Sequence, residues 1–191
     1  SAFYTVPLGK GKRFGSNMPR LVDTAIGGWS FGMLQIAQCG QPFTVNSQRL
    51  TTAVSGILAS GTFAQFNGTD RNIGSVDKRG TGVFFFSPDQ ISQFGFPGAG
   101  EFGNSGRNVF RNPGFFETDL SIVKKFALTE RHAVSFRAEA YNLFNHPNFG
   151  LAAANLNLNN PPTFGKFSQT LGTQTSASSA RHMTMVLRYD Y

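Results

Sequence analysis

The stretch RNVFRNPGFFETDLSIVKKFALTERHAVSFRAEAYNLFNHPNF, residues 107–149, decides the fold because it holds two runs of alternating apolar and polar residues. The first run places on one face Phe116, Thr118, Leu120, Ile122 and Phe126. It places on the other face Glu117, Asp119, Ser121 and Lys125, while Val123 and Lys124 break the pattern. Successive side chains of a strand point to opposite sides, so a period of two predicts a β-strand.

The second run begins after a short polar turn at Leu128–Arg131. Its apolar face carries Val134, Phe136, Ala138 and Ala140. Its opposite face carries Ser135, Arg137, Glu139 and Tyr141. A short turn between two such runs predicts an antiparallel hairpin.

The last eleven residues repeat the alternation more regularly than either earlier run. One face carries Met183, Met185, Leu187, Tyr189 and Tyr191. The other carries His182, Thr184, Val186, Arg188 and Asp190. A transmembrane β-strand needs about 9–11 tilted residues, and all three runs are near that length. A soluble β-sandwich also alternates in this way. The dense charge on the polar faces and the aromatic residues near the ends of the apolar faces favour a membrane barrel.

These segments together resemble the C-terminal end of a TonB-dependent outer-membrane receptor of the Oar-like type. The resemblance lies in residues 103–126 (GNSGRNVFRNPGFFETDLSIVKKF), residues 131–150 (RHAVSFRAEAYNLFNHPNFG) and the aromatic-terminated last strand. Earlier segments resemble the same region, at residues 7–14, 27–45 and 164–172, so the likeness covers nearly the whole chain. It implies an upstream carboxypeptidase-regulatory-like domain and plug. It also implies that Met183, Met185, Leu187, Tyr189 and Tyr191 form the signal read by the barrel-assembly machinery.

The whole chain is therefore expected to be all-β, the C-terminal part of an up-and-down antiparallel outer-membrane barrel. Strands are expected near residues 2–6, 29–45, 115–127, 132–145 and 181–191, within a single barrel segment 1–191. Residues 46–112 and 146–180 are expected to form long extracellular loops, because barrels of this kind have short periplasmic turns and long outer loops. Pro7 to about Thr24, which is rich in glycine, is expected to be a turn region.

Composition excludes several classes of function. The net charge is +7, yet the basic residues are scattered apart from Lys10, Lys12 and Arg13, so no nucleic-acid platform is predicted. The chain has no apolar run of 18 residues, which excludes a transmembrane helix. Cys39 is the single cysteine, so no disulfide can form within the chain.

The residues with chemical potential do not form a catalytic pattern. Gly98, Gly100 and Gly103 match a dinucleotide-binding string, but no strand and helix are expected around them, and no cofactor is predicted. His132, His146 and His182 lack the spacing of metal ligands, so no metal site is predicted. Six charged residues are expected to face a polar lumen and to form cross-strand ion pairs, without catalysis: Glu117, Asp119, Arg137, Glu139, Arg188 and Asp190.

The expected function is part of a transporter for a large or scarce substrate, located in the bacterial outer membrane. Its expected partners are outer-membrane lipid, the barrel-assembly machinery, and the upstream plug and barrel of the same polypeptide. The chain is too short to close a barrel of the size implied by the resemblance. If the 191 residues are the whole mature chain, the alternative is an extracellular structural subunit that assembles with other copies of itself by strand addition. A soluble carbohydrate-binding sandwich is a third interpretation, for which Trp29 is the only tryptophan available.

Overall fold

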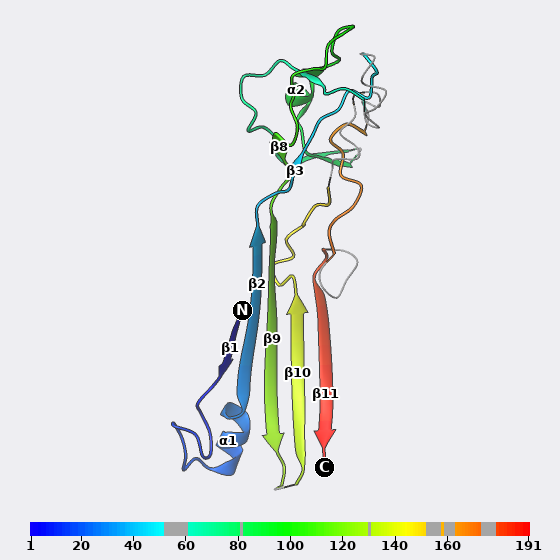
Figure 1. The fold of residues 1–191 in the computed structure, drawn as a ribbon. Helices are drawn as coiled ribbons and strands as arrows, with labels where there is room; N and C mark the ends of the chain where they lie inside the picture. Colours follow the sequence, from blue (N-terminus) through cyan, green and yellow to red (C-terminus); the bar gives the residue numbers. More distant parts are fainter. Residues whose placement is uncertain (52–60, 81, 130, 152–157, 159–162, 173–178) are drawn as a thin grey trace. The chain divides into compact units, whose positions relative to one another are not determined.

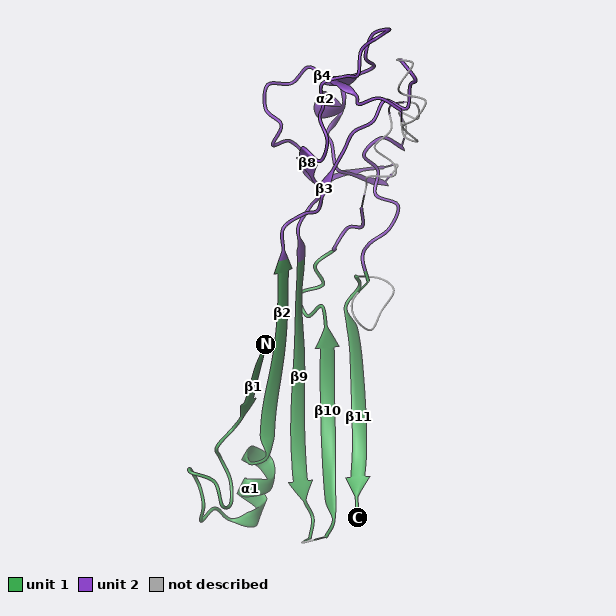
Figure 2. Ribbon diagram, in the orientation of Figure 1, with its two compact units in different colours: residues 1–37, 116–147, 172–191 green, residues 38–115, 148–171 purple. Residues whose placement is uncertain are grey.

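The computed structural model covers the whole chain and describes all residues except 52–60, 81, 130, 152–157, 159–162 and 173–178. The described residues form two compact units, shown in different colours in Figure 2. Unit 1 comprises Ser1–Ala37, Phe116–Pro147 and Gly172–Tyr191. Unit 2 comprises Gln38–Phe115 and Asn148–Leu171.

One five-stranded antiparallel sheet dominates the fold, with strand order β1-β2-β9-β10-β11 (Figure 1). Its strands are β1 (Ala2–Thr5), β2 (Trp29–Gln38), β9 (Phe115–Ala127), β10 (Ala133–Tyr141) and β11 (His182–Asp190). The five strands follow one another across the sheet in chain order. The connections from β2 to β9 and from β10 to β11 include the segments that make up unit 2. The prediction of an all-β, antiparallel, up-and-down fold is confirmed.

Two predicted strands end earlier than expected. The strand predicted for 29–45 stops at Gln38, and β3 (Pro42–Phe43) follows as a separate element paired with β8 (Phe110–Arg111). Between them the backbone of Gly40 passes so close to the Asn112 carbonyl that a Cβ atom would clash with it. The strand predicted for 132–145 stops at Tyr141, because Asn142 adopts a left-handed conformation with φ 49°.

The prediction of a turn region from Pro7 to about Thr24 is wrong at its end, where helix α1 spans Arg20–Ile26. Residues 7–19 contain three glycines and two prolines, which favour turns, and a seven-residue helix gives too short a periodic signal to stand out. Within the described part of the chain, no helix has the length and the apolar character that crossing a membrane requires.

Unit 2 takes in most of the two segments, 46–112 and 146–180, that the sequence predicts as long loops. Its described residues form three strand pairs, β3–β8, β4 (Gln65–Phe66) with β7 (Phe94–Gly95), and β5 (Asp77–Arg79) with β6 (Gly82–Phe84). Helix α2 (Pro88–Ile91) begins with a capping box between Ser87 and Gln90.

Phenylalanine supplies most of the core of unit 2. The buried cluster consists of Phe43, Val45, Ala64, Phe66, Phe85, Phe86, Phe94, Phe110, Leu158, Phe164 and Phe167. Many rings meet edge to face, such as Phe86 with Phe110, whose ring planes are 88° apart at a centroid distance of 6.2 Å. The strands of this unit are only two or three residues long, so side-chain packing, more than sheet pairing, holds it together.

Candidate functional site: the polar face of the sheet

The pairing register divides β9, β10 and β11 into two faces. On the polar face, Ser135 lies opposite Lys125 on β9 and Arg188 on β11. Glu139 lies opposite Ser121 and Thr184. Because side chains alternate along each strand, all six predicted lumen residues lie on this polar face: Glu117, Asp119, Arg137, Glu139, Arg188 and Asp190.

The apolar face lies on the other side of the same strands. Val134 lies between Phe126 and Tyr189, and Ala138 lies between Ile122 and Met185. Four of the five residues of the predicted barrel-assembly signal are on this face, namely Met183, Met185, Leu187 and Tyr189, and Tyr191 follows the strand. The side chain of Leu187 is 73% exposed. On β11 this face is largely exposed, and an exposed apolar face of this kind needs an apolar surrounding.

Strand β9 is regular through Val123 and Lys124, where the sequence pattern breaks. Val123 pairs with Arg137 on the polar face, and Lys124 pairs with Phe136 on the apolar face. Lys124 is nevertheless only 2% exposed. Its ammonium group donates hydrogen bonds to the carbonyls of Ala25, at 3.1 Å, and Gly27. This neutral cage accounts for a basic residue on an otherwise apolar face.

Charge is separated along the polar face. The acidic residues Glu117, Asp119 and Glu139 lie toward the end where β9 and β11 begin. The basic residues Lys125, Arg137 and Arg188 lie toward the β9–β10 turn, with Asp190 beyond them. The polar face is therefore acidic toward one end and mainly basic toward the other.

The prediction of cross-strand ion pairs is wrong for the pairs that the structure describes on this face. Arg137 Nη1 lies 3.7 Å from Glu139 Oε1, and Arg188 Nε lies 2.6 Å from Asp190 Oδ1. Both pairs join residues two positions apart on one strand, because such residues share a face and long side chains can reach along it. The pairs are partly exposed, so each is expected to contribute at most about 1 kcal/mol to stability.

The acidic end of the polar face is the more enclosed one. Glu117 is 2% exposed, and its Oε1 atom has no hydrogen-bond partner among the described residues. Asp119 Oδ1 accepts a hydrogen bond from the Asn142 backbone N–H at 2.9 Å. The Tyr141 hydroxyl donates to Glu139 at 3.1 Å. Two of the three carboxylates are thus oriented by the end of β10.

Asn142 organises this end and was missed as a site residue. It is buried, its amide donates to the carbonyls of His146, at 2.8 Å, and Ser179, and its side-chain oxygen accepts from the His146 N–H at 2.9 Å. Asparagine tolerates left-handed backbone and bonds locally to the main chain. Its place directly after an alternating run was the signal that could have identified it.

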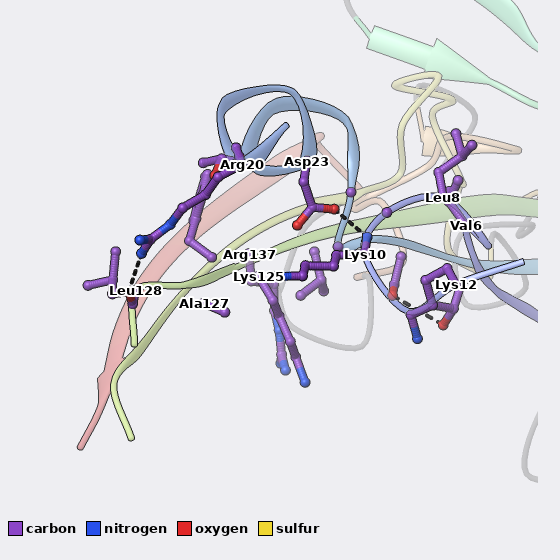
Figure 3. A pocket seen from close by; sticks show the side chains of 18 of the residues that line it. Val6, Leu8, Lys10, Lys12, Arg20, Asp23, Lys125, Ala127, Leu128 and Arg137 are labelled. Atoms are coloured by element: carbon purple, nitrogen blue, oxygen red, sulfur yellow. Dashed lines mark hydrogen bonds between the residues drawn. The ribbon is translucent and has the colours of Figure 1, made fainter. Parts of the chain in front are cut away.

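A hollow of about 1160 Å³ opens at the other end of unit 1, beside the β9–β10 turn (Figure 3). Lys10, Lys12, Arg20, Lys125 and Arg137 line it. Asp23 also lines the hollow, and its carboxylate accepts the Lys10 backbone N–H at 2.6 Å. The excess of positive charge suits an anionic group or an acidic protein segment.

The histidines lie in three separate aromatic contacts. His132 stacks on Tyr189, His146 meets Phe116 edge on, and His182 stacks on Tyr141. No group of three or more potential metal ligands occurs within the described ranges. The glycine string at Gly98–Gly103 lies between β7 and β8, with no helix directly after it, so the structure lacks the strand–helix setting that a dinucleotide site requires.

Comparison with known proteins identifies a family for this chain. A family model described as "Outer membrane beta barrel domain" matches residues 1–184. Neither the curated proteins nor the solved structures that were searched contain a match.

Proposed function

We propose that this chain forms part of the wall of a TonB-dependent transporter. The chain belongs to the outer membrane beta barrel domain family, and it lies in the bacterial outer membrane. In this assignment the apolar face of the sheet contacts lipid and the polar face lines the lumen. The six charged residues of the polar face then orient and guide solutes, and no chemical step is assigned to them.

The observation that carries the proposal is the unequal length of the connections at the two ends of the sheet. At one end β9 and β10 are joined by the short turn Leu128–His132, closed by hydrogen bonds from Leu128 and Thr129 to the His132 carbonyl. At the other end β2 is joined to β9 through residues 39–114, most of which fold into unit 2. Large outer loops above a barrel support recognition of a large substrate at the cell surface.

The partners follow from the same assignment. The resemblance of the sequence implies an upstream plug, and the basic hollow beside the β9–β10 turn would face it from the periplasmic end of the lumen. The terminal strand is proposed to be read by the barrel-assembly machinery. The substrate class is a chelated metal, a glycan or a peptide, as the resemblance implies.

An uptake assay tests this function. Cells with and without the native protein are grown on a mixture of ferric chelates, oligosaccharides and peptides, and depletion of each compound is measured by mass spectrometry. The proposal expects at least one compound whose depletion needs both the protein and the proton-motive force, which an uncoupler removes. Depletion that persists with the uncoupler, or no difference between the cells, contradicts it.

A second candidate is a self-assembling subunit, which the two outer strands of the sheet favour. In the described part of the chain β1 and β11 each pair with a single neighbour, so each has a free edge. Light scattering after size-exclusion chromatography separates the two candidates. A protein that stays monomeric in detergent supports the transporter, whereas filaments or rings that form without detergent support assembly.

A further inference from the structure

Helix α1 is amphipathic, although it has only seven residues. At about 100° per residue, Leu21, Val22, Ala25 and Ile26 share one side, and Arg20, Asp23 and Thr24 share the other. None of its residues is buried. Leu21 is 86% exposed, although the polar residues of the helix lie on its other side.

The polar side fixes how the helix is oriented. The Arg20 guanidinium donates to the Leu128 carbonyl in the β9–β10 turn. The Asp23 carboxylate accepts from Lys10 in the preceding segment. These contacts direct the polar side toward the basic hollow (Figure 3), while Leu21 on the apolar side is largely exposed.

The C-terminal end of α1 is attached to the apolar face of the sheet. The Ala25 carbonyl accepts hydrogen bonds at 3.1 Å from both Lys124 Nζ and Trp29 Nε1. The Trp29 ring stacks on Phe31 along β2, at a centroid distance of 6.4 Å. The apolar side of the helix is therefore continuous with the face of the sheet that contacts lipid in a membrane barrel.

We propose that α1 is an interfacial anchor that lies in the periplasmic leaflet of the outer membrane, with Leu21, Val22 and Ile26 at the boundary between phospholipid headgroups and acyl chains. The occupant of its apolar side is a phospholipid monolayer. Amphipathic helices bind in this region through their apolar side, and tryptophan is enriched at the same depth. The short β9–β10 turn beside the helix identifies this end of the sheet as periplasmic. The anchor fixes the depth at which the strands sit, and it rests on membership of the outer-membrane family and on no transport activity.

Depth-dependent fluorescence quenching tests the anchor. The native protein, in a Cys39→Ser background, receives a single cysteine at Leu21→Cys or at Thr24→Cys, and an environment-sensitive dye is attached to it. Thr24 is the matched control because it is exposed on the polar side of the same helix. The protein is reconstituted in vesicles of phosphatidylethanolamine and phosphatidylglycerol, with or without lipids that carry a nitroxide quencher.

The expected result is strong lipid quenching and a blue-shifted emission at Leu21, with aqueous iodide quenching the dye at Thr24. Equal iodide quenching at both positions overturns the anchor. A dye at Leu21 that neither quencher reaches also overturns it, because the apolar side would then be covered by protein. A third variant, Leu187→Cys on the apolar face of β11, separates the two proposals. Lipid quenching at Leu187 without quenching at Leu21 overturns the anchor alone, whereas no quenching at either position overturns the membrane barrel as well.

Discussion

The ammonium group of Lys124 lies 5.0 Å from the centroid of the Trp29 ring, on a sheet face whose neighbouring side chains are apolar. The Phe126 ring is 5.2 Å from the same group. Such cation–π contacts favour a cation that is shielded from water. The two aromatic rings and the carbonyls of Ala25 and Gly27 surround the Lys124 ammonium group. These contacts link β9 to β2 and to the C-terminal end of α1.

Loss of this lysine is expected to loosen the attachment of α1. Lys124→Ala removes two hydrogen bonds that a charged group donates to carbonyls, so we expect the free energy of unfolding to fall by about 1–3 kcal/mol. Lys125→Ala is the matched control, because Lys125 is exposed and lies on the polar face. Urea titration of the protein in detergent measures both variants. Equal changes in the two variants would show that the cage around Lys124 has no special role.

The phenylalanine core of unit 2 should respond strongly to a single truncation. Phe86 is fully buried and contacts Phe85, Phe94, Phe110 and Phe164. Phe86→Ala is expected to cost about 3–5 kcal/mol and to expose unit 2 to protease added outside intact cells. Phe102→Ala, at a position that is 46% exposed, should leave the cleavage pattern unchanged. A resistant Phe86→Ala variant would contradict the assigned core.

The two faces of β11 should differ in their access to water. Met185 is on the apolar face and Val186 is on the polar face, although both are exposed in the chain by itself. In a Cys39→Ser background we expect a water-soluble maleimide to label Val186→Cys in membranes and to spare Met185→Cys. Both positions should react after transfer to urea, which serves as the control. Labelling of both in membranes would place water on both faces of the sheet.

Two neighbouring carboxylates on β9 should behave differently. Asp119→Ala leaves the Asn142 N–H without its acceptor and is expected to destabilise the protein by about 1–3 kcal/mol. Glu117→Gln removes a buried charge, one oxygen of which has no partner among the described residues, and is expected to leave stability unchanged or to raise it by about 1 kcal/mol. Thermal unfolding in detergent compares the two. A larger loss for Glu117→Gln would indicate a partner supplied from elsewhere.

The final aromatic residue is expected to affect assembly more than stability. Tyr191 is 95% exposed and makes a stacked contact with Tyr189 at a centroid distance of 6.2 Å, so Tyr191→Ser should change the unfolding free energy by less than about 0.5 kcal/mol. If the terminal strand is the assembly signal, the amount of folded protein in the outer membrane should fall several-fold. Heat-modifiable mobility on gels measures it. Tyr4→Ser, at another exposed aromatic position, is the control.

The sequence predicts the large strands well and their connections poorly. The predicted strand 115–127 matches β9 residue for residue, because the alternation on either side of Val123 and Lys124 leaves little choice of register. Helix α1 was missed, and unit 2 gave no periodic signal, since its core is assembled from phenylalanines at irregular spacing. The six residues predicted to line a lumen share one face of the sheet, whereas their ion pairs run along strands and Asn142 is not predicted.

The sequence alone determined which side chains share a face of the sheet, because alternation along a strand is a local property of the backbone. Only the tertiary structure decided what surrounds Lys124, since the hydrogen bond to Ala25 joins residues 99 positions apart. The same holds for the side of α1 that faces outward, which depends on the contact between Arg20 and Leu128. Contacts between distant segments leave no period in the sequence, so such decisions appear only when the strands are brought together.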